Sequence, residues 1–428
     1  MNRRGFIRTS TAATAAVAFP SVIPGHVLAA PGRRLGANDR IQVGFIGLGG
    51  RARAILKEEG LPGADLVAVA DCFFPRCEEA AKLIPGGEKW RKYSDHRTLL
   101  DKEKLDAVFV ETTTHARVLI AMHALQAGLD VYCEKPMSLT IAEGRALVNA
   151  VKKTGRVLQV GSQQRSMPIN QFASKLVREG AIGKVREVIV FNFWPPIDWV
   201  PRAARPIPAG LNWDLWCNQT ELRPYHPALQ FGWPNYVEYD GGGMGWGVSG
   251  WGTHSLDQVQ CALGTDDTGP VELIPEVTPG EPGPLCRVTL RYASGTLLKL
   301  AGPKRGFEDL GAIFVGDRGR IDIRRGSAVA DPKELLKGAP PDNPSVRPGE
   351  TIMHLQNFFE CMRTRCKPNA DVETGHRATT VCHLVNIVRA VGRKLYWDPK
   401  AENFVGDDEA NDFLSRPRRK GYELPQIG

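Results

Sequence analysis

The sequence has no long hydrophobic run and little excess charge. After residue 30, no segment approaches the roughly twenty apolar residues that a membrane-spanning helix needs, so the mature chain is expected to lack a transmembrane span. The formal net charge is +8 over 428 residues, and three of the arginines lie in the first thirty residues. Such a mild excess disfavours nucleic acid as a partner. The basic cluster Arg416-Pro417-Arg418-Arg419-Lys420 is typical of a solvated tail.

Paired cysteines and metal-ligand spacings are missing as well. The nine cysteines form no CxxC pair and their number is odd, which favours small buried side chains over a disulfide framework. No group of histidines, cysteines and acids has the spacing of a metal site, so no metal is expected.

The first thirty residues have the layout of a twin-arginine signal peptide. Arg3 and Arg4 precede a hydrophobic pair and Arg8, a weakly apolar run follows from residue 9 to 22, and small residues come after it. Residues 1–30 are therefore expected to direct export, which makes the mature protein periplasmic or secreted. A disordered basic N-terminus is the alternative.

The segment from 41 to 71 predicts a dinucleotide site. A buried strand pattern at 41–46 runs into Gly47-Leu48-Gly49-Gly50-Arg51-Ala52, which is a G-x-G-x-x-A loop ahead of a helical stretch at 53–59. Its glycines allow the turn and the approach of a pyrophosphate, and the alanine allows close packing of the helix on the strand. The next strand ends in Asp71, whose carboxylate would accept the ribose hydroxyls and repel a 2′-phosphate. NAD is favoured over NADP, although the nearby Arg76 weakens that preference.

Strands and helices alternate as far as residue 161, which predicts a parallel, doubly wound sheet. Strand patterns lie at 105–110, 131–133 and 156–161, and helical patterns at 117–126 and 140–153. Longer strand-like runs then follow, at 185–193, 287–292 and 296–300. A chain of this length needs two domains, so we expect a Rossmann domain at 39–162, a second α/β domain at 163–397 and a C-terminal tail at 398–428. The segment from 194 to 250, rich in Pro, Trp and Gly, is long for an unstructured loop and is a candidate functional element.

The strand at 131–133 ends in Glu134-Lys135-Pro136. A lysine at the carboxyl end of a buried strand faces the crevice where α/β sheets bind ligands, and its partial desolvation lowers its pKa toward the range useful for proton transfer. A surface lysine at a strand end is the alternative interpretation. The Lys135–Pro136 bond is a candidate for a cis peptide.

These motifs resemble one family, the glucose–fructose oxidoreductase, inositol dehydrogenase and MocA oxidoreductases. The shared pieces are the glycine loop, Asp71, the element from Thr112 to His115, the A-G-x-x-V-x-x-E-K-P run and Gly252-Thr253-His254-Ser255-Leu256-Asp257. The ending of the chain, from Glu373 onward, looks like the secreted twin-arginine branch. The resemblance implies a Rossmann domain followed by an α/β domain with an open, mostly antiparallel sheet. One face of that sheet would cover the nicotinamide and the other would form a homo-oligomer.

The resemblance also implies the site residues. Lys135 and His254 would flank the substrate carbon as the catalytic pair. The candidate cofactor contacts are Gly47, Leu48, Gly49, Gly50, Arg51, Ala52, Asp71, Thr112, His115 and Glu134. The candidate substrate contacts are Arg165, Trp251 and Asp257.

The expected function is that of an exported oxidoreductase that uses tightly bound NAD(H) on a sugar, polyol or sugar derivative. One departure bears on it, because the family often carries an aspartate four residues before the histidine and this chain has Gly250. Asp257 or another acid would then orient His254, or the chemistry differs. Two alternatives stay open: a glycoside-cleaving enzyme that works through a keto intermediate, and a non-catalytic sugar-binding protein with a structural nucleotide.

Overall fold

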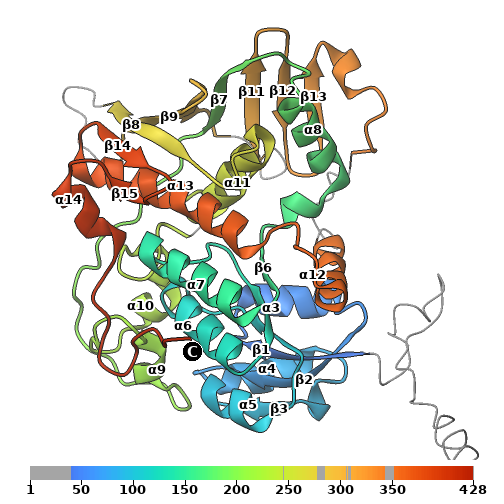
Figure 1. The fold of residues 1–428 in the computed structure, drawn as a ribbon. Coiled ribbons are helices and arrows are strands. Elements are labelled where there is room, and N and C mark those ends of the chain that lie inside the picture. Colours follow the sequence, from blue (N-terminus) through green and yellow to red (C-terminus); the bar gives the residue numbers. More distant parts are fainter. Residues whose placement is uncertain are drawn as a thin grey trace, which may run out of the picture. The chain divides into compact units, whose positions relative to one another are not determined.

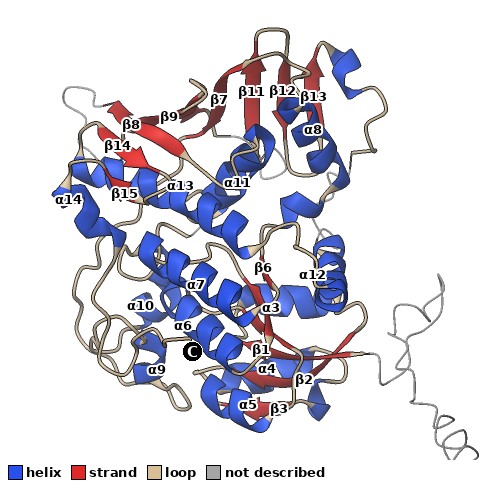
Figure 2. Cartoon of the chain, in the orientation of Figure 1, coloured by secondary structure: helices blue, strands red, loops and turns tan. Residues whose placement is uncertain are grey.

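The computed structural model describes residues 40–243, 245–276, 285–304, 306, 310–342 and 351–427. The expected signal peptide, residues 1–30, lies outside these ranges. Two sheets organise the described chain, and Figures 1 and 2 show α11 (Trp251–Leu263) and α13 (Val372–Val391) between them.

The first sheet is the predicted doubly wound Rossmann sheet. Its six strands are all parallel and run in the order β3-β2-β1-β4-β5-β6. Their bounds are β1 Ile41–Ile46, β2 Ala64–Ala70, β3 Arg91–Tyr93, β4 Ala107–Val110, β5 Asp130–Cys133 and β6 Leu158–Val160. The central strands are almost continuously apolar because helices cover both of their faces.

The helices of this sheet begin and end near their sequence signals. Besides α4 (Pro75–Leu83) and α5 (His96–Lys102), they include α6 (Thr114–Gln126), which stops before Gly128 at φ 79°, and α7 (Ile141–Thr154). The α7 helix starts after Thr140, whose hydroxyl accepts a hydrogen bond from the backbone N–H of Glu143, and it ends at Gly155.

The stretch expected to be helical, 53–59, is helical throughout but is not a regular α-helix. The α-helix α3 covers only Gly50–Ala54 and continues as a single π-helical turn, Ile55–Glu59. This turn is closed by the backbone N–H of Gly60, which donates to the carbonyl of Ile55 five residues earlier.

The second sheet is the expected open and mostly antiparallel one. Its strand order is β13-β12-β11-β7-β10-β9-β8-β14-β15, and β7 with β10 is its parallel pair. The bounds are β7 Val185–Phe191, β8 Pro270–Glu276, β9 Arg287–Tyr292, β10 Leu297–Gly302, β11 Ala312–Gly316, β12 Arg320–Ile323, β13 Ala328–Asp331, β14 Leu395–Asp398 and β15 Asn403–Phe404. Its apolar core packs against α11, α13 and α8 (Pro168–Arg178).

One helix from late in the chain covers the first sheet instead. The α12 helix (Ile352–Thr364) places Leu355, Phe358 and Phe359 in the core formed with β1, β4 and β5. Chain order therefore does not separate the two sheets completely.

The segment from 194 to 250 is not an unstructured loop. It contains α9 (Trp213–Cys217) and α10 (Pro227–Gly232) and has an aromatic core of its own. Trp213 and Trp216 stack with ring centroids 4.4 Å apart in that core. Many of its tryptophans are therefore packing residues. A backbone hydrogen bond from Asn212 to the carbonyl of Cys72 fastens the segment beside β2.

The basic C-terminal cluster is not a solvated tail, contrary to expectation. Arg416 donates to the carbonyl of Val237, Arg418 pairs with Glu143 at 2.6 Å, and Arg419 pairs with Asp214. The strand β15 also lies within the supposed tail at 398–428 and pairs with β14. These contacts hold the end of the chain against the Rossmann helices and the 194–250 segment, because the arginines find carboxylate and carbonyl partners there.

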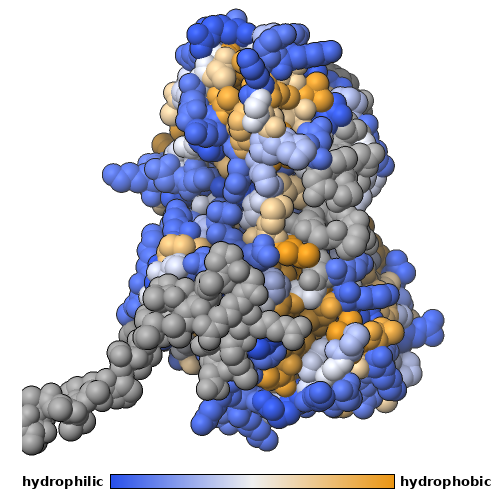
Figure 3. All heavy atoms as spheres, turned by 90° about the vertical axis from the view of Figure 1, so that its right-hand side faces the viewer, coloured by the Kyte–Doolittle hydropathy of each residue, from blue (hydrophilic) through white to orange (hydrophobic). Residues whose placement is uncertain are grey.

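The face seen in Figure 3 is mostly hydrophilic, with apolar areas between polar side chains. Among the residues that the structure describes, no helix has both the length and the apolar character needed to cross a membrane.

Candidate functional site

A cavity of about 760 Å³ opens at the carboxyl ends of the Rossmann strands. The loops after β1, β2, β4 and β5 line one side, and α11, Arg325 and the 194–250 segment line the other. Ligands of open α/β sheets bind at this position. The cavity therefore brings residues from both sheets to one place.

The glycine loop has the geometry that a dinucleotide needs. Gly47 has φ 90°, and a Cβ there would lie 2.8 Å from the carbonyl oxygen of Glu111. Gly49 and Gly50 line the cavity, and a Cβ on either would meet no atom within 4 Å, so it would project into open space. Glycine thus leaves room for a phosphate to approach the backbone, as expected.

Two other loop residues do not reach the cavity. Ala52 is fully buried, in agreement with its predicted packing role, and the side chain of Leu48 is also fully buried. The Leu48 backbone N–H donates to the Asp71 carboxylate at 2.8 Å. Neither side chain contributes to the lining, so both act through backbone geometry and packing.

Asp71 lines the cavity at the end of β2, where the ribose-binding acid was predicted. Besides the bond from Leu48, it accepts a 2.8 Å hydrogen bond from the Phe73 backbone N–H. Burial raises its pKa, while Arg76, 3.9 Å away, and the two N–H donors act in the opposite direction. Arg76 lines the cavity too, so it lies where a positive charge was expected to weaken the preference for NAD over NADP.

Glu134 lines the cavity and is held on several sides. Its carboxylate accepts hydrogen bonds from Arg51 Nε at 3.0 Å, from Gln163 at 3.2 Å and from the Lys135 backbone N–H at 3.0 Å. Arg51 also donates a hydrogen bond to the Thr351 hydroxyl at 2.7 Å. Burial acts to lower the pKa of Arg51, but Glu134 and other neighbouring groups together outweigh it and the pKa is raised. Glu134 therefore holds Arg51 and Gln163, which also line the cavity, in position.

Lys135 is half-buried at the end of β5, and its Nζ donates to the backbone carbonyl of Gly250 at 2.9 Å. Burial lowers its pKa, as the sequence predicted. The Lys135–Pro136 peptide is cis, which confirms that prediction as well. The amino group therefore lies against the segment that leads into α11.

His254 lies in the first turns of α11 and lines the same cavity. Its side chain is buried, and its Nδ1 has no hydrogen-bond partner among the described residues. Burial, followed by the positive charges of Arg325 and Lys135, lowers its pKa well below the usual value. The imidazole is neutral near pH 7 and can accept a proton.

No side chain fits at position 250. A Cβ on Gly250 would lie 2.6 Å from the Gly245 carbonyl oxygen and 2.8 Å from that of Gly243. The position of the family's aspartate is therefore filled by backbone. The backbone of Gly250 still contributes, because its carbonyl accepts the hydrogen bond from Lys135.

A different acid, Asp240, is buried near Lys135. Its carboxylate accepts hydrogen bonds from the Thr114 hydroxyl at 2.5 Å and from the Ser249 hydroxyl. Asp240 and Lys135 affect each other's pKa, with Asp240 raising that of the lysine and the lysine lowering that of the acid. Sequence reasoning missed this residue, because no motif links it to Glu134-Lys135-Pro136.

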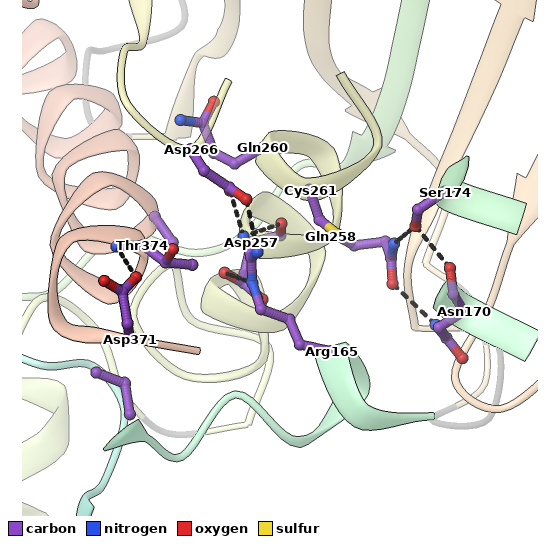
Figure 4. Close-up of polar contacts among 12 residues, drawn as sticks. Arg165, Asn170, Ser174, Asp257, Gln258, Gln260, Cys261, Asp266, Asp371 and Thr374 are labelled. Atoms are coloured by element: carbon purple, nitrogen blue, oxygen red, sulfur yellow. Dashed lines mark hydrogen bonds and ion pairs between the residues drawn. The ribbon is translucent and has the colours of Figure 1, made fainter. Parts of the chain in front are cut away.

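Arg165 and Asp257 are not on the cavity surface, so their predicted role as substrate contacts is corrected. Figure 4 shows that they bind each other, with Arg165 Nε 2.8 Å from Asp257 Oδ1, and that Arg165 also binds Asp266 at 2.7 Å. Both side chains are almost fully buried. This ion pair joins α11 to the loop after β6, and it leaves Asp257 committed to Arg165 rather than to His254.

His115 was also misassigned as a cofactor contact. It is fully buried, its Nε2 lies 2.8 Å from the Trp216 carbonyl oxygen, and its ring packs on Tyr239 and Trp216. It fastens α9 to the Rossmann domain. Thr112, by contrast, does line the cavity, and so does Trp251.

Several other residues that line the cavity were not predicted. Glu111 directly follows β4, and both of its carboxylate oxygens lack a hydrogen-bond partner among the described residues. Burial, with Glu134 second, raises its pKa. Arg325 follows β12, and Phe231 and Trp233 come from the 194–250 segment. These residues reach the cavity only through the tertiary structure, and no local sequence motif marks them.

No group of three or more histidines, cysteines and acids that could hold a metal ion occurs among the described residues.

Sequence comparison decides the family. Residues 41–162 match the model of the oxidoreductase family's NAD-binding Rossmann fold, and residues 170–424 match that of its C-terminal alpha/beta domain. The chain belongs to the Gfo/Idh/MocA oxidoreductase family. The described fold has both parts of that family, the parallel Rossmann sheet and the larger mixed sheet.

Curated relatives of this family match mainly over the first domain. Scyllo-inositol 2-dehydrogenase (NAD(+)) of Bacillus subtilis is 35% identical over 124 residues, or 29% of this chain and 35% of its own length. D-apiose dehydrogenase of Paraburkholderia graminis is 36% identical over 123 residues, or 29% of this chain and 32% of its own length. The chain thus spans about a third of the length of these relatives.

Solved family structures agree over most of the chain at lower identity. The WlbA dehydrogenase of Bordetella pertussis, solved in complex with NADH and UDP-GlcNAcA, has a TM-score of 0.62 and 18% identity, covering 84% of this chain and 99% of its own. Aldose-aldose oxidoreductase of Caulobacter crescentus has a TM-score of 0.57 and 22% identity, covering 83% and 99%. These likenesses establish the shared fold.

Proposed function

We propose that this protein is an NAD(H)-dependent oxidoreductase that acts on a CH–OH group of a sugar, polyol or sugar derivative. The observation that carries the proposal is that Lys135, after β5, and His254, on α11, line one cavity together with the glycine loop and Asp71. The names of the relatives, dehydrogenases of inositol and apiose, support the substrate class.

The cavity fits a dinucleotide along its Rossmann side. Gly49 and Gly50 leave open space for a pyrophosphate, and Asp71 is placed to accept ribose hydroxyls while disfavouring a 2′-phosphate. NAD is therefore the proposed cofactor. When bound, it supplies the acceptor or donor of a hydride.

The protein's own residues would handle the proton. In the oxidation direction, the alcohol O–H bond breaks and its proton passes to a ring nitrogen of the neutral His254. The Lys135 Nζ, held by the Gly250 carbonyl, would hydrogen-bond the substrate oxygen and polarise it. In the reduction direction, the same groups return the proton to the new alcohol oxygen.

Asp240 supplies the charge that the glycine at position 250 cannot. Its carboxylate acts electrostatically on Lys135, and its bond from Ser249 fixes the residue next to Gly250. The substrate side of the cavity, with Trp233, Trp251 and Phe231, offers aromatic faces on which the C–H face of a sugar ring can stack.

Export is a second part of the proposal. The twin-arginine pattern of residues 1–30 supports transport of a folded protein, so the cofactor would cross bound and remain bound outside the cytosol. A closed cycle of oxidation and reduction follows from retained cofactor. A homo-oligomer formed through the second sheet belongs to the same proposal.

The test begins with the purified mature protein. Nucleotide released from the protein by acid and separated by chromatography is expected to be NAD or NADH. In a second experiment, sugars and polyols are added to the protein without added cofactor, and the absorbance of the bound nucleotide is expected to change. A preparation that neither contains nor binds nicotinamide nucleotide would contradict the proposal. Binding of sugars without turnover across the panel would favour the non-catalytic alternative.

Lys135→Met then tests the site. Loss of a positioned proton-transfer group is expected to lower kcat by about 10²–10⁴-fold while bound nucleotide is retained. Lys153→Met is the matched control, because Lys153 is exposed on α7 and should leave kcat unchanged. Turnover at the full rate in Lys135→Met would remove the lysine from the mechanism.

A further inference from the structure

Two cysteines meet at the C-terminal end of α12. Cys361 lies in its last turn and Cys366 lies just beyond its end, and their sulfur atoms are 3.1 Å apart. This is closer than unbonded sulfur atoms normally pack. All nine cysteines of the chain are free in the structure, and only this pair of described cysteines has a recorded sulfur–sulfur contact.

The backbone produces this contact. The α12 helix ends at Thr364, and Arg365 adopts φ 58°, in the left-handed region that reverses the chain after a helix. The reversal carries Cys366 back over the last turn. Arg365 is held in place by its guanidinium, which bonds both carboxylate oxygens of Asp130 at 2.8 and 2.9 Å.

The two thiols differ in a way that suits oxidation. Cys366 is exposed, and hydrogen bonds from the Thr364 hydroxyl and from Cys361 lower its pKa. Cys361 is buried, and that burial raises its pKa to about 12. The exposed sulfur of Cys366 is thus the better nucleophile, and the buried sulfur of Cys361 is in contact with it.

We propose that Cys361 and Cys366 are a disulfide-forming site whose co-reactant is a disulfide-bearing oxidant, either a small-molecule disulfide or an oxidised dithiol protein. The Cys366 thiolate attacks one sulfur of the oxidant, forms a mixed disulfide and releases the first thiol. The Cys361 sulfur then attacks Cys366 Sγ and releases the second thiol. Two cysteine thiols are oxidised, the external disulfide is reduced, and the two protons end on the released thiols.

The bond would fasten the helix that covers the cofactor-binding sheet. Phe358 and Phe359 of α12 pack on the Rossmann core, and Thr351, just before the helix, accepts a hydrogen bond from Arg51 of the glycine loop. Closing the turn at the other end of α12 restricts the unfolded chain and stabilises the native one. The inference is independent of the proposed oxidoreductase activity.

Trypsin separates the two cysteines, because it cuts after Arg363 and Arg365. Full-length protein is incubated with glutathione disulfide or with dithiothreitol, free thiols are alkylated, and the digest is analysed by mass spectrometry without reduction. The oxidised sample is expected to contain the Cys361 and Cys366 peptides as one linked species. Dithiothreitol and the variants Cys366→Ser and Cys361→Ser should each abolish it.

Cys72 and Cys261 are internal controls, because both are partly exposed without a recorded sulfur neighbour and should enter no linked peptide. Oxidised wild type should also melt a few degrees above its reduced form, a difference that Cys366→Ser should lose. Two results would overturn the proposal: Cys366 carrying glutathione while Cys361 is alkylated, or alkylation of both sulfurs after exposure to the oxidant.

Discussion

Restoring the family's aspartate at position 250 should impair this protein. In Gly250→Asp, the new Cβ would lie 2.6 and 2.8 Å from the carbonyl oxygens of Gly245 and Gly243. These are backbone atoms, which cannot turn aside as the end of a flexible side chain can. Relief requires the loop to move, and that loop carries the carbonyl that receives the Lys135 hydrogen bond.

The expected magnitude follows from the crowding. Forcing extra atoms into a well-packed region costs about 1–3 kcal/mol. If that cost is paid by displacing the carbonyl from Lys135, it lowers kcat/KM by roughly 5- to 150-fold, at 1.36 kcal/mol for each factor of ten. If the loop that carries the Gly250 carbonyl keeps its position, the same free-energy cost appears instead as a lower stability against urea.

Three variants separate sterics from charge. Gly250→Ala carries the same Cβ without a carboxylate and should lose a similar amount of stability, while Gly250→Asp should lose at least as much. Gly49→Ala meets no atom within 4 Å and should leave stability unchanged while weakening nucleotide binding. Urea midpoints and turnover are measured for each. An aspartate variant as stable as wild type and more active would refute the reasoning.

Two further predictions concern charge. In Asp240→Asn, loss of the opposite charge should move the Lys135 limb of the kcat/KM pH profile to lower pH, and Ser249→Ala, which keeps the carboxylate, should move it less. An unmoved limb in the asparagine variant would contradict this electrostatic role. Burial lowers the pKa of His115 and His354 from 6.5 to about 4, so the unfolded chain binds more protons between these values. Their contribution to stability is complete above pH 6.5 and is lost as pH falls toward 4. Urea unfolding at about pH 7 and pH 5 should show a loss on the order of 1–2 kcal/mol per histidine, smaller in His354→Gln; an equal loss in that variant would contradict the assignment.

The parts of the fold that local patterns specify were predictable. Five of the six Rossmann strands are short apolar runs that lie within a few residues of their predicted places, whereas β3 (Arg91–Tyr93), a short and mostly polar strand at the edge of the sheet, was not predicted. The glycine loop, Asp71 and Glu134-Lys135-Pro136 are strand-end motifs, so chain order alone sends them to one edge of a parallel sheet. The lowered pKa of Lys135 follows from the same placement.

The errors concern residues whose role depends on distant partners. Arg165 is a plausible sugar contact until Asp257 and Asp266, about a hundred residues later in the chain, take its guanidinium. His115 lies away from the cavity for the same reason, because its Nε2 lies against the distant Trp216 carbonyl. Arginines in the C-terminal segment look solvated because their acceptors, Glu143 among them, lie far away in the sequence. Spacing along the chain cannot show such pairs.

Asp240 is a buried acid that acts on Lys135 although position 250 carries no acid. A comparison by position finds glycine where the family's acid would be and suggests a lost proton relay. In the folded chain, the glycine-rich turn after Asp240 returns to place Ser249 on its carboxylate and the Gly250 carbonyl on Lys135. The small residues make this return possible, because a Cβ at Gly247 would overlap the Gly242 carbonyl. The glycines and the displaced acid are therefore best understood as one arrangement, in which the backbone takes the hydrogen bond and Asp240 supplies the charge.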